Sequence, residues 1–169
     1  MKRGMVSGSF DPPTWGHLDL VRRAAALFDE VVVCLFRNAE KTALFSEEDR
    51  LRMLHAMLEE AGLSDVRVDF FSGYVADYAR ENRISYVVRG LRNERDTAYE
   101  IEMARYNAAR NPSLETLFLV SPAERVGISS TEARKRLEEG RDASNFLPPA
   151  VLRLARACLE KGFSSTSMI

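Results

Sequence analysis

Apolar and polar residues along the chain separate into short apolar runs and longer stretches with a helical repeat of apolar positions. Each apolar run has the length of a strand. The run EVVVCLF is apolar almost throughout, which is typical of a strand buried on both faces of a parallel sheet. The runs predict strands at Arg3–Ser7, Glu30–Phe36, Val66–Phe71, Tyr86–Val88 and Thr116–Val120.

The stretches between and after these runs predict helices. They are expected at Trp15–Phe28, from Ser46 to Gly62, at Val75–Arg80, at Glu94–Arg110, from Ser129 onward and at Pro149–Lys161. This alternation predicts an α/β fold with one five-stranded parallel sheet and helices on both faces. We expect a single domain over residues 1–162 and a flexible tail over residues 163–169. Ligands of such folds bind beyond the carboxyl ends of the strands, where strand order reverses.

Composition narrows the classes of function. The chain has 169 residues, 46% apolar and 29% charged, with a net charge of −1. This balance gives no electrostatic case for binding nucleic acid or an anionic membrane. No apolar stretch is long enough to span a bilayer and no signal peptide is evident, so a cytoplasmic location is expected. Cys34 and Cys158 lie in apolar segments and are expected to be buried thiols.

The first polar motif, GSFDPPTWGH at residues 8–17, joins the first strand to a helix that begins with His17 in its first turn. A helix start presents unpaired N–H groups and the positive end of the helix dipole, so it suits a phosphate. Gly8 and Gly16 allow close approach of a ligand to the backbone. The alternative is an ordinary strand-to-helix turn with a polar histidine.

Three more polar groups are expected at the same edge of the sheet. Residues 89–92 (RGLR) place two arginines around a glycine and offer forked donors to phosphates; salt bridges to Glu94 and Asp96 are the alternative. Residues 128–131 (ISST) present three hydroxyls at a helix start, which could also serve only as a cap. Lys41 lies in a polar loop. It could bind a phosphate, or it could be an ordinary lysine exposed to solvent.

These motifs together resemble a known family. The segment TWGH resembles the (T/H)xGH signature of the nucleotidyltransferase superfamily. The whole decapeptide is similar to the GTFDPxTxGH form of bacterial phosphopantetheine adenylyltransferases, with Ser9 in place of a threonine. RGLR and ISST follow in the order and spacing of that family. The resemblance runs from Gly8 to residues 146–148 and implies a Rossmann-like nucleotidyltransferase fold.

The resemblance also implies roles for individual residues. His17 is the expected catalytic residue, near the phosphate bond that breaks. The residues expected to bind 4′-phosphopantetheine are Ser9, Lys41, Val75 and Arg89. The residues expected to bind ATP are Ser9, Phe10, His17, Gly90, Leu91, Arg92, Glu100, Arg125, Val126, Gly127, Ile128, Ser129, Ser130 and Thr131. Arg125 stands where several relatives carry an aromatic residue, which leaves the packing against adenine open.

The implied reaction is adenylyl transfer from ATP to 4′-phosphopantetheine, giving dephospho-coenzyme A and pyrophosphate by direct in-line attack. The implied cofactor is Mg²⁺, held mainly by the phosphates and not by protein ligands. A homohexamer and feedback by coenzyme A are also implied by the family. Two alternatives stay open: a related nucleotidyltransferase acting on nicotinamide mononucleotide or on a sugar or glycerol phosphate, and a non-catalytic nucleotide-sensing module.

Overall fold

The computed structural model describes residues 1–37 and 42–166, and it confirms the predicted α/β fold. Within these residues the strands form one sheet in the order β3-β2-β1-β4-β5, and each neighbouring pair is parallel. The strands are β1 (Arg3–Gly8), β2 (Glu30–Phe36), β3 (Arg67–Phe71), β4 (Tyr86–Leu91) and β5 (Glu115–Val120). Strand order reverses between β1 and β4, so a ligand is expected beyond the carboxyl ends of these two strands.

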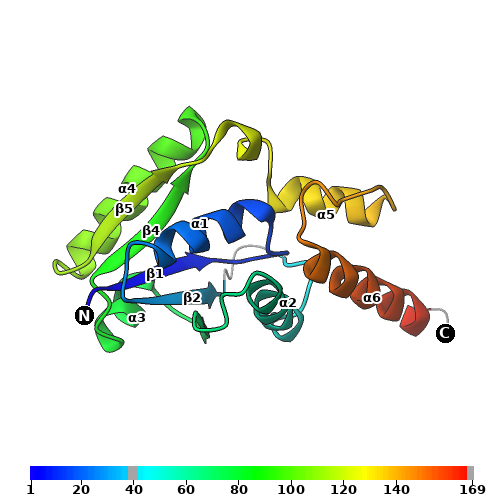
Figure 1. The fold of residues 1–169 in the computed structure, drawn as a ribbon, viewed down its shortest axis with the longest axis horizontal. Coiled ribbons are helices and arrows are strands. Elements are labelled where there is room, and N and C mark those ends of the chain that lie inside the picture. Colours follow the sequence, from blue (N-terminus) through cyan, green and yellow to red (C-terminus); the bar gives the residue numbers. More distant parts are fainter. Residues whose placement is uncertain (38–41, 167–169) are drawn as a thin grey trace.

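Helices cover both faces of the sheet (Figure 1). They are α1 (Trp15–Ala25), α2 (Glu47–Glu60), α3 (Val75–Glu81), α4 (Glu94–Arg110), α5 (Ser130–Glu138) and α6 (Pro149–Thr166), with a short 3-10 helix, η1 (Ala123–Arg125). Helices α1 and α2 pack on one face, and α3 and α4 pack on the other. Helix α6 packs against α2, and α5 lies beyond the carboxyl end of β1.

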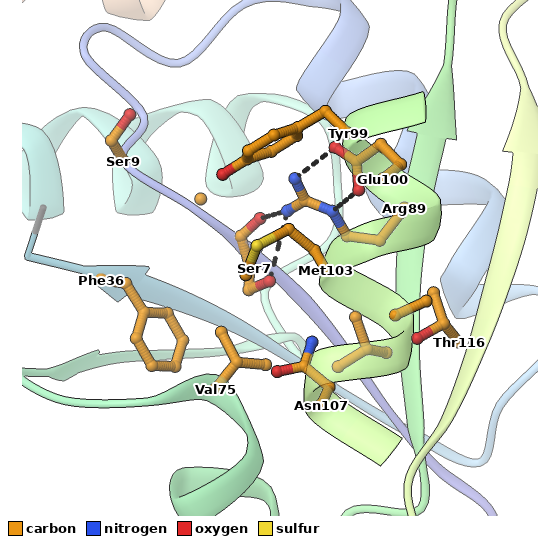
Figure 2. Close-up of a pocket in the computed structure, with 13 residues that line it drawn as sticks. Ser7, Ser9, Phe36, Val75, Arg89, Tyr99, Glu100, Met103, Asn107 and Thr116 are labelled. Carbon is orange, nitrogen blue, oxygen red and sulfur yellow. Dashed lines mark hydrogen bonds and ion pairs between the residues drawn. The ribbon is translucent and has the colours of Figure 1, made fainter. Parts of the chain in front are cut away.

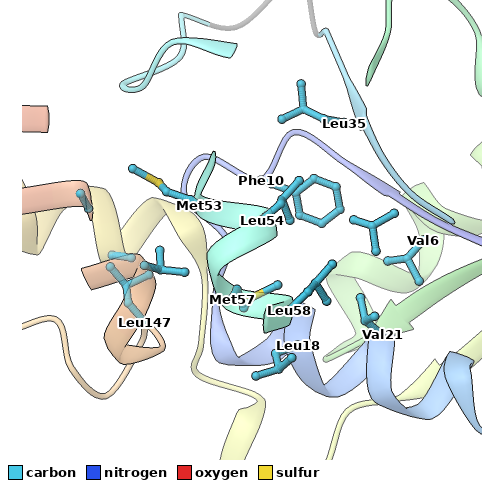
Figure 3. Close-up of a cluster of buried hydrophobic side chains, with 14 of the residues drawn as sticks. Val6, Phe10, Leu18, Val21, Leu35, Met53, Leu54, Met57, Leu58 and Leu147 are labelled. Atoms are coloured by element: carbon cyan, nitrogen blue, oxygen red, sulfur yellow. The ribbon is translucent and has the colours of Figure 1, made fainter. Parts of the chain in front are cut away.

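The side chains of β1 and β2 alternate between two apolar clusters, as the pleat of a strand requires. Val6 and Val33 join the cluster beneath α1 and α2, whereas Met5 and Cys34 join the cluster beneath α3. The first cluster includes Val6, Phe10, Leu18, Val21, Leu35, Met53, Leu54, Met57, Leu58 and Leu147 (Figure 3). Cys34 is buried as expected, but Cys158 on α6 is only half-buried.

Helices α1 and α6 depart most from their predicted ends. Helix α1 ends at Ala25, where the chain turns so that Phe28 packs against Gly4. A Cβ atom at Gly4 would lie 2.6 Å from the Phe28 ring, so this packing requires glycine. Helix α6 continues past Lys161 to Thr166. None of the helices in the described part of the chain is long and apolar enough to cross a membrane.

Strand β4 is longer than its apolar core suggests. It pairs with β5 as far as Leu91 opposite Val120. Arg89 and Gly90 therefore belong to the strand itself, whereas the sequence pattern placed them just after it. The rigid sheet, and not a loop, sets the position of the Arg89 side chain.

Candidate active site

Two adjoining cavities lie beyond the carboxyl ends of β1 and β4. One has a volume of about 340 Å³ and extends toward α1 and α5, and we call it the first cavity. The second cavity, of about 280 Å³, lies between α3 and α4 (Figure 2). The two share the wall formed by Ser7, Gly8, Ser9, Arg89 and Glu100. Two ligands placed in these cavities would meet at that wall.

Most of the residues predicted from the family resemblance lie around these cavities. The first cavity is lined by Ser9, His17, Arg89, Gly90, Arg92, Glu100, Arg125, Ile128, Ser129, Ser130 and Thr131. The second is lined by Ser9, Val75, Arg89 and Glu100. Four predicted residues line neither cavity: Phe10, Leu91, Val126 and Gly127. Lys41 lies outside the described residues.

A capping box at the start of α1 orients His17. Thr14 is the N-cap residue, and its side chain accepts a hydrogen bond from the His17 backbone N–H. In return, the Thr14 backbone N–H donates to Nδ1 of His17 over 3.0 Å, so the ring takes the place that Glu or Gln usually fills. Because Nδ1 accepts, the neutral ring carries its proton on Nε2. The first cavity is thus lined by a histidine whose Nε2–H can donate.

The surroundings of His17 favour the neutral ring. Burial, and then the nearby Arg89 and Arg92 guanidinium groups, lower the pKa of His17 from 6.5 to about 4. Both causes act against the charged form of the ring. Near neutral pH the ring is therefore an uncharged hydrogen-bond donor.

This shift predicts how His17 titrates. We expect the ring to stay neutral, with its proton on Nε2, until the pH falls to about 4. In the unfolded chain the ring takes up a proton near the ordinary histidine pKa of 6.5, so protonation favours unfolding between about pH 6.5 and 4, and stability falls as the pH falls through that window. Nitrogen NMR of the imidazole, assigned with a His17→Gln variant, measures the titration. A midpoint near 6.5, or a proton on Nδ1, would contradict the assignment.

Phe10 does not line either cavity but packs beneath His17 in the core. Its ring is buried and meets the His17 ring edge to face, with the ring centroids 4.9 Å apart. Its φ of 45° is a left-handed conformation that few residues other than glycine adopt. Backbone strain of this kind is found mostly at functional sites. The loop is held from both sides: Arg50 donates to the Ser9 carbonyl (2.8 Å) and Arg134 to the Asp11 carbonyl (2.7 Å).

The Asp11 carboxylate fastens a second loop to the first. Its two oxygens accept the backbone N–H groups of Leu44 (2.8 Å) and Phe45 (3.0 Å), and the residue is 4% exposed. These two residues close the segment that contains Lys41. Asp11 therefore ties the backbone of Leu44 and Phe45 to the turn that carries His17.

Replacing Asp11 with Asn should weaken this tie. An amide has only one accepting oxygen, so one of the two backbone N–H groups would face another N–H group. A hydrogen bond to a charged group contributes roughly 1.5–3 kcal/mol, so we expect the KM for 4′-phosphopantetheine, the acceptor that the family resemblance implies, to rise about tenfold or more. Steady-state kinetics measures this. The matched control is Asp29→Asn, since Asp29 also accepts a backbone N–H, from Lys2, but near the N-terminus. Equal effects of the two substitutions would contradict the specific role of Asp11.

Arg89 is held by a two-pronged ion pair with Glu100. Its Nε and Nη2 atoms donate to the two carboxylate oxygens over 2.8 and 2.6 Å, and Nη1 donates to the Ser7 carbonyl over 2.6 Å (Figure 2). The partner is Glu100, not Glu94 or Asp96 as the sequence suggested. Three of the five N–H bonds of Arg89 are used in this way.

The other two N–H bonds of Arg89 are available to a ligand. One makes only a long contact, from Nη1 to the Ser7 hydroxyl over 3.4 Å, and the other has no partner among residues 1–37 and 42–166. The side chain lines both cavities. A phosphate oxygen at the shared wall could therefore accept from this guanidinium group without displacing Glu100.

Arg92 connects the RGLR segment to the start of α5. It forms an ion pair with Asp96, one of the partners considered from the sequence, at 2.8 Å. It also donates to the Ile128 carbonyl at 3.1 Å. Since Ile128 immediately precedes the N-cap of α5, this bond fixes that helix start against β4.

The hydroxyls at the start of α5 are already used within the protein. Ser129 accepts from the backbone N–H of Glu132, and Ser130 donates to the Pro12 carbonyl over 2.9 Å. The first N–H groups of a helix have no partner inside it. The backbone of α5 therefore offers hydrogen-bond donors to the first cavity, with the favourable end of the helix dipole behind them.

Two glycines keep the first cavity open. A Cβ atom at Gly16 would lie no closer than 3.6 Å to the rest of the described chain, and one at Gly90 no closer than 3.9 Å. Neither glycine has a positive φ. Packing and backbone conformation therefore do not require glycine at either position, but a side chain there would project into the space of the cavity.

The second cavity is lined by both apolar and polar side chains, and some of its polar groups lack partners among the described residues. Phe36, Val75 and Met103 line it. Asn107 is 6% exposed, and its side-chain amide has no hydrogen-bond partner in the described part of the chain. Figure 2 shows it beside Val75. Thr116 Oγ1 is also buried and has no partner among residues 1–37 and 42–166. This cavity suits a ligand that carries both apolar groups and hydrogen-bonding groups.

The sequence reasoning missed several lining residues, including Ser7, Thr14, Asp96, Tyr99 and Ser121. Thr14 could have been found, because it lies three residues before His17 in the spacing of a capping box. Tyr99 precedes Glu100 on α4 and lies on the side of the second cavity. Ser7 and Ser121 carry no signal of their own, since only the pairing of β1, β4 and β5 brings them to the site.

The fold and this site define a class of protein. A strand, a turn and a helix start with a neutral histidine, facing a second helix start and two arginines, are the parts of a nucleotidyltransferase. Residues 5–136 match the cytidylyltransferase-like family. The solved structure of Plasmodium falciparum nicotinic acid mononucleotide adenylyltransferase complexed with APC has the same fold, with a TM-score of 0.68 and 16% identity, over 90% of this chain and 93% of that one.

Sequence relatives define the family more narrowly. A phosphopantetheine adenylyltransferase of Nocardioides is 42% identical over 162 residues, which covers 96% of this chain and all of the relative. That of Borreliella burgdorferi is 37% identical over 165 residues, covering 95% of this chain and all of the relative. The chain belongs to the phosphopantetheine adenylyltransferase family.

Proposed function

We propose that this protein transfers the adenylyl group of ATP to 4′-phosphopantetheine, forming dephospho-coenzyme A and pyrophosphate. The observation that carries the proposal is the pair of cavities that meet at Arg89. The first has the phosphate-binding features of two helix starts and a histidine. The second combines apolar side chains with the buried amide of Asn107. Two ligands joined through a phosphate fit this arrangement.

The reaction needs no group of the protein as a nucleophile. An oxygen of the phosphopantetheine phosphate, already an anion near neutral pH, attacks the α-phosphorus of ATP. The bond from that phosphorus to the oxygen of the β-phosphate breaks, and pyrophosphate leaves. Catalysis then consists of alignment and stabilisation of charge.

The residues of the site have distinct parts in this scheme. Arg89, fixed by Glu100, binds the attacking phosphate with its two remaining N–H bonds. His17 donates from Nε2 to a phosphate oxygen of ATP as charge builds up in the transition state. The start of α5 binds the pyrophosphate that leaves. Since His17 is neutral and already oriented by Thr14, it donates without a prior change of protonation.

The site fits a Mg²⁺ ion that arrives with the nucleotide better than one held by the protein. The two carboxylates in the first cavity, Asp96 and Glu100, are both engaged by arginines. Among the described residues no three His, Cys, Asp or Glu side chains come together as a metal site. Mg²⁺ characteristically binds phosphate oxygens and keeps several waters. It would supply charge neutralisation on the triphosphate.

Several expectations from the family resemblance stay predictions. They are the contact of Lys41 with the acceptor phosphate, the binding roles of Val126 and Gly127, the homohexamer, feedback by coenzyme A, and the cytoplasmic location. Light scattering tests the assembly. Inhibition of the forward reaction by coenzyme A tests the feedback.

One assay tests the proposed function. The full chain is incubated with ATP, Mg²⁺ and 4′-phosphopantetheine, while pyrophosphate and dephospho-coenzyme A are both measured. We expect the two products in equal amounts. Nicotinamide mononucleotide and glycerol 3-phosphate serve as alternative acceptors, and faster turnover with either would reject the acceptor proposed. Binding of ATP without turnover of any acceptor would favour a nucleotide sensor.

A further inference from the structure

Arg50 on α2 carries a buried charge that the scheme above does not use. The residue is 5% exposed, and its guanidinium group donates from Nη1 to the Ser9 carbonyl over 2.8 Å and from Nε to the Ser46 carbonyl over 3.4 Å. Among residues 1–37 and 42–166 it has these two acceptors and no ion pair. A buried charge without an opposite charge beside it costs free energy, so its presence calls for an explanation.

The acidic residues nearest to Arg50 in sequence do not pair with it. The first turn of α2 contains three of them, Glu47, Glu48 and Asp49. Glu47 forms a two-pronged pair with Arg37, at 2.6 and 2.9 Å, and Asp49 pairs with Arg52 at 3.4 Å. Glu48 is exposed, and residues two positions apart on a helix do not face each other. The charge of Arg50 is therefore not neutralised by a contact within its own helix.

The other arginines that hold the shared wall, or the turn that follows it, do have carboxylate partners. Arg89 pairs with Glu100 at 2.6 Å, and Arg134 lies 3.6 Å from the Asp11 carboxylate. Arg50 is thus the surplus positive charge of this group. An anionic ligand at the wall would supply the missing negative charge.

The shorter hydrogen bond of Arg50 reaches the wall itself. Its acceptor belongs to Ser9, which lines both cavities, whereas Arg50 lines neither. The next residue, Phe10, has the left-handed φ of 45°, a costly conformation that persists only where the surrounding structure holds it. Arg50 therefore acts on the cavities in two ways, by fixing Ser9 and by placing a charge directly behind it.

We propose that Arg50 is a positioning residue for adenylyl transfer, whose charge behind Ser9 strengthens the binding of the phosphate groups that meet at the shared wall. The inference rests on the proposed function, because it takes ATP and 4′-phosphopantetheine as the two ligands. Two unit charges interact about four times more strongly near a protein surface than in bulk water. The cost of burying Arg50 is then offset when the anionic ligands bind.

Arg50→Gln and Arg50→Lys separate charge from hydrogen bonding, because both can donate to the Ser9 carbonyl and only lysine keeps the charge. For Arg50→Gln we expect the Kd for inorganic tripolyphosphate, and the KM for both substrates, to rise about tenfold. Arg50→Lys should bind tripolyphosphate within about threefold of the parent protein. Calorimetry and steady-state kinetics on the full chain measure these values.

Thermal unfolding without ligand gives a readout that a merely structural role would not produce. Arg50→Gln removes an unpaired buried charge but keeps an N–H donor, so its Tm should equal or exceed that of the parent. Lower affinity together with undiminished stability is the expected signature. The matched control is Arg52→Gln, since Arg52 is exposed on the same helix, and it should change neither Kd nor KM.

The results decide the proposal in either direction. Tripolyphosphate binding by Arg50→Gln at the parent's affinity would overturn it, and so would equal weakening in Arg50→Lys. Unfolding of Arg50→Gln at a much lower temperature than the parent would also overturn it, because the charge would then stabilise the free protein. These outcomes leave dephospho-coenzyme A formation by the unchanged protein intact. If that product fails to form while tripolyphosphate binding follows the charge at position 50, the proposed function is wrong and the phosphate site stands.

Discussion

His17→Ala should lower kcat about 10²–10³-fold with little change in the KM for ATP. The neutral ring is held by Thr14 before any substrate arrives, with its pKa lowered to about 4 by burial and by Arg89 and Arg92. An oriented donor of this kind contributes mainly where charge develops, in the transition state. The measurement is steady-state kinetics with 4′-phosphopantetheine and ATP, supported by calorimetric binding of ATP to the variant.

Two further variants sharpen this experiment. His55→Ala is the matched control. His55 is the only other histidine of the chain, and it is exposed on α2, away from both cavities. It should leave the kinetics unchanged. His17→Asn removes the ring but keeps a short polar side chain in the first turn of α1. Its kcat should be as low as that of the alanine variant. Turnover of His17→Ala within a few-fold of the parent protein would remove His17 from the mechanism.

The expected pH profile follows from the same geometry. Since His17 is neutral above about pH 4, its titration should not limit activity between pH 5 and 8. A histidine with the unperturbed pKa of 6.5 would instead switch its charge within this range. An activity limb near pH 6.5 that disappears in a His17 variant would show that the ring is less buried than the structure indicates.

Much of the fold could be predicted from the apolar pattern, because a strand buried on both faces of a sheet is a continuous apolar run in the sequence. The run EVVVCLF is strand β2, and the alternation of strands and helices is enough to define a parallel sheet. The strand order could not be read from the pattern, since it depends on which apolar faces meet. The end of α1 was also missed: Phe28 continues the helical repeat but packs against Gly4 instead.

The positions of candidate site residues were predictable where a short local motif sets their geometry. Gly16, His17 and the start of α5 depend on local geometry that a short motif encodes. The partner of Arg89 was not predictable in this way, because Glu94 and Asp96 are nearer in sequence than Glu100. The choice is made by β4, which carries Arg89 within the strand, and by the face of α4 that turns toward it.

Arg89→Ala should abolish most of the binding of 4′-phosphopantetheine while ATP still binds. We expect the Kd for the acceptor to rise about 100-fold, because the variant loses both the charge and the two N–H bonds offered to its phosphate. The same change leaves the carboxylate of Glu100, 8% exposed, without its cation. Breaking such a pair destabilises the fold by up to about 3 kcal/mol, at the low end of the usual range because the Arg89 side chain keeps 28% exposure.

A double variant separates these two losses. Adding Glu100→Gln to Arg89→Ala removes the unpaired charge, so the free energy of unfolding should recover substantially while the acceptor still fails to bind. Arg92→Ala is the matched comparison: Arg92 also pairs with a carboxylate but lines only the first cavity, so its loss should weaken ATP more than the acceptor. Calorimetry with each ligand and thermal unfolding measure both quantities. Acceptor binding that returns together with stability in the double variant would mean that Arg89 only holds the fold, and that another cation, with Lys41 the first to test, receives the phosphate.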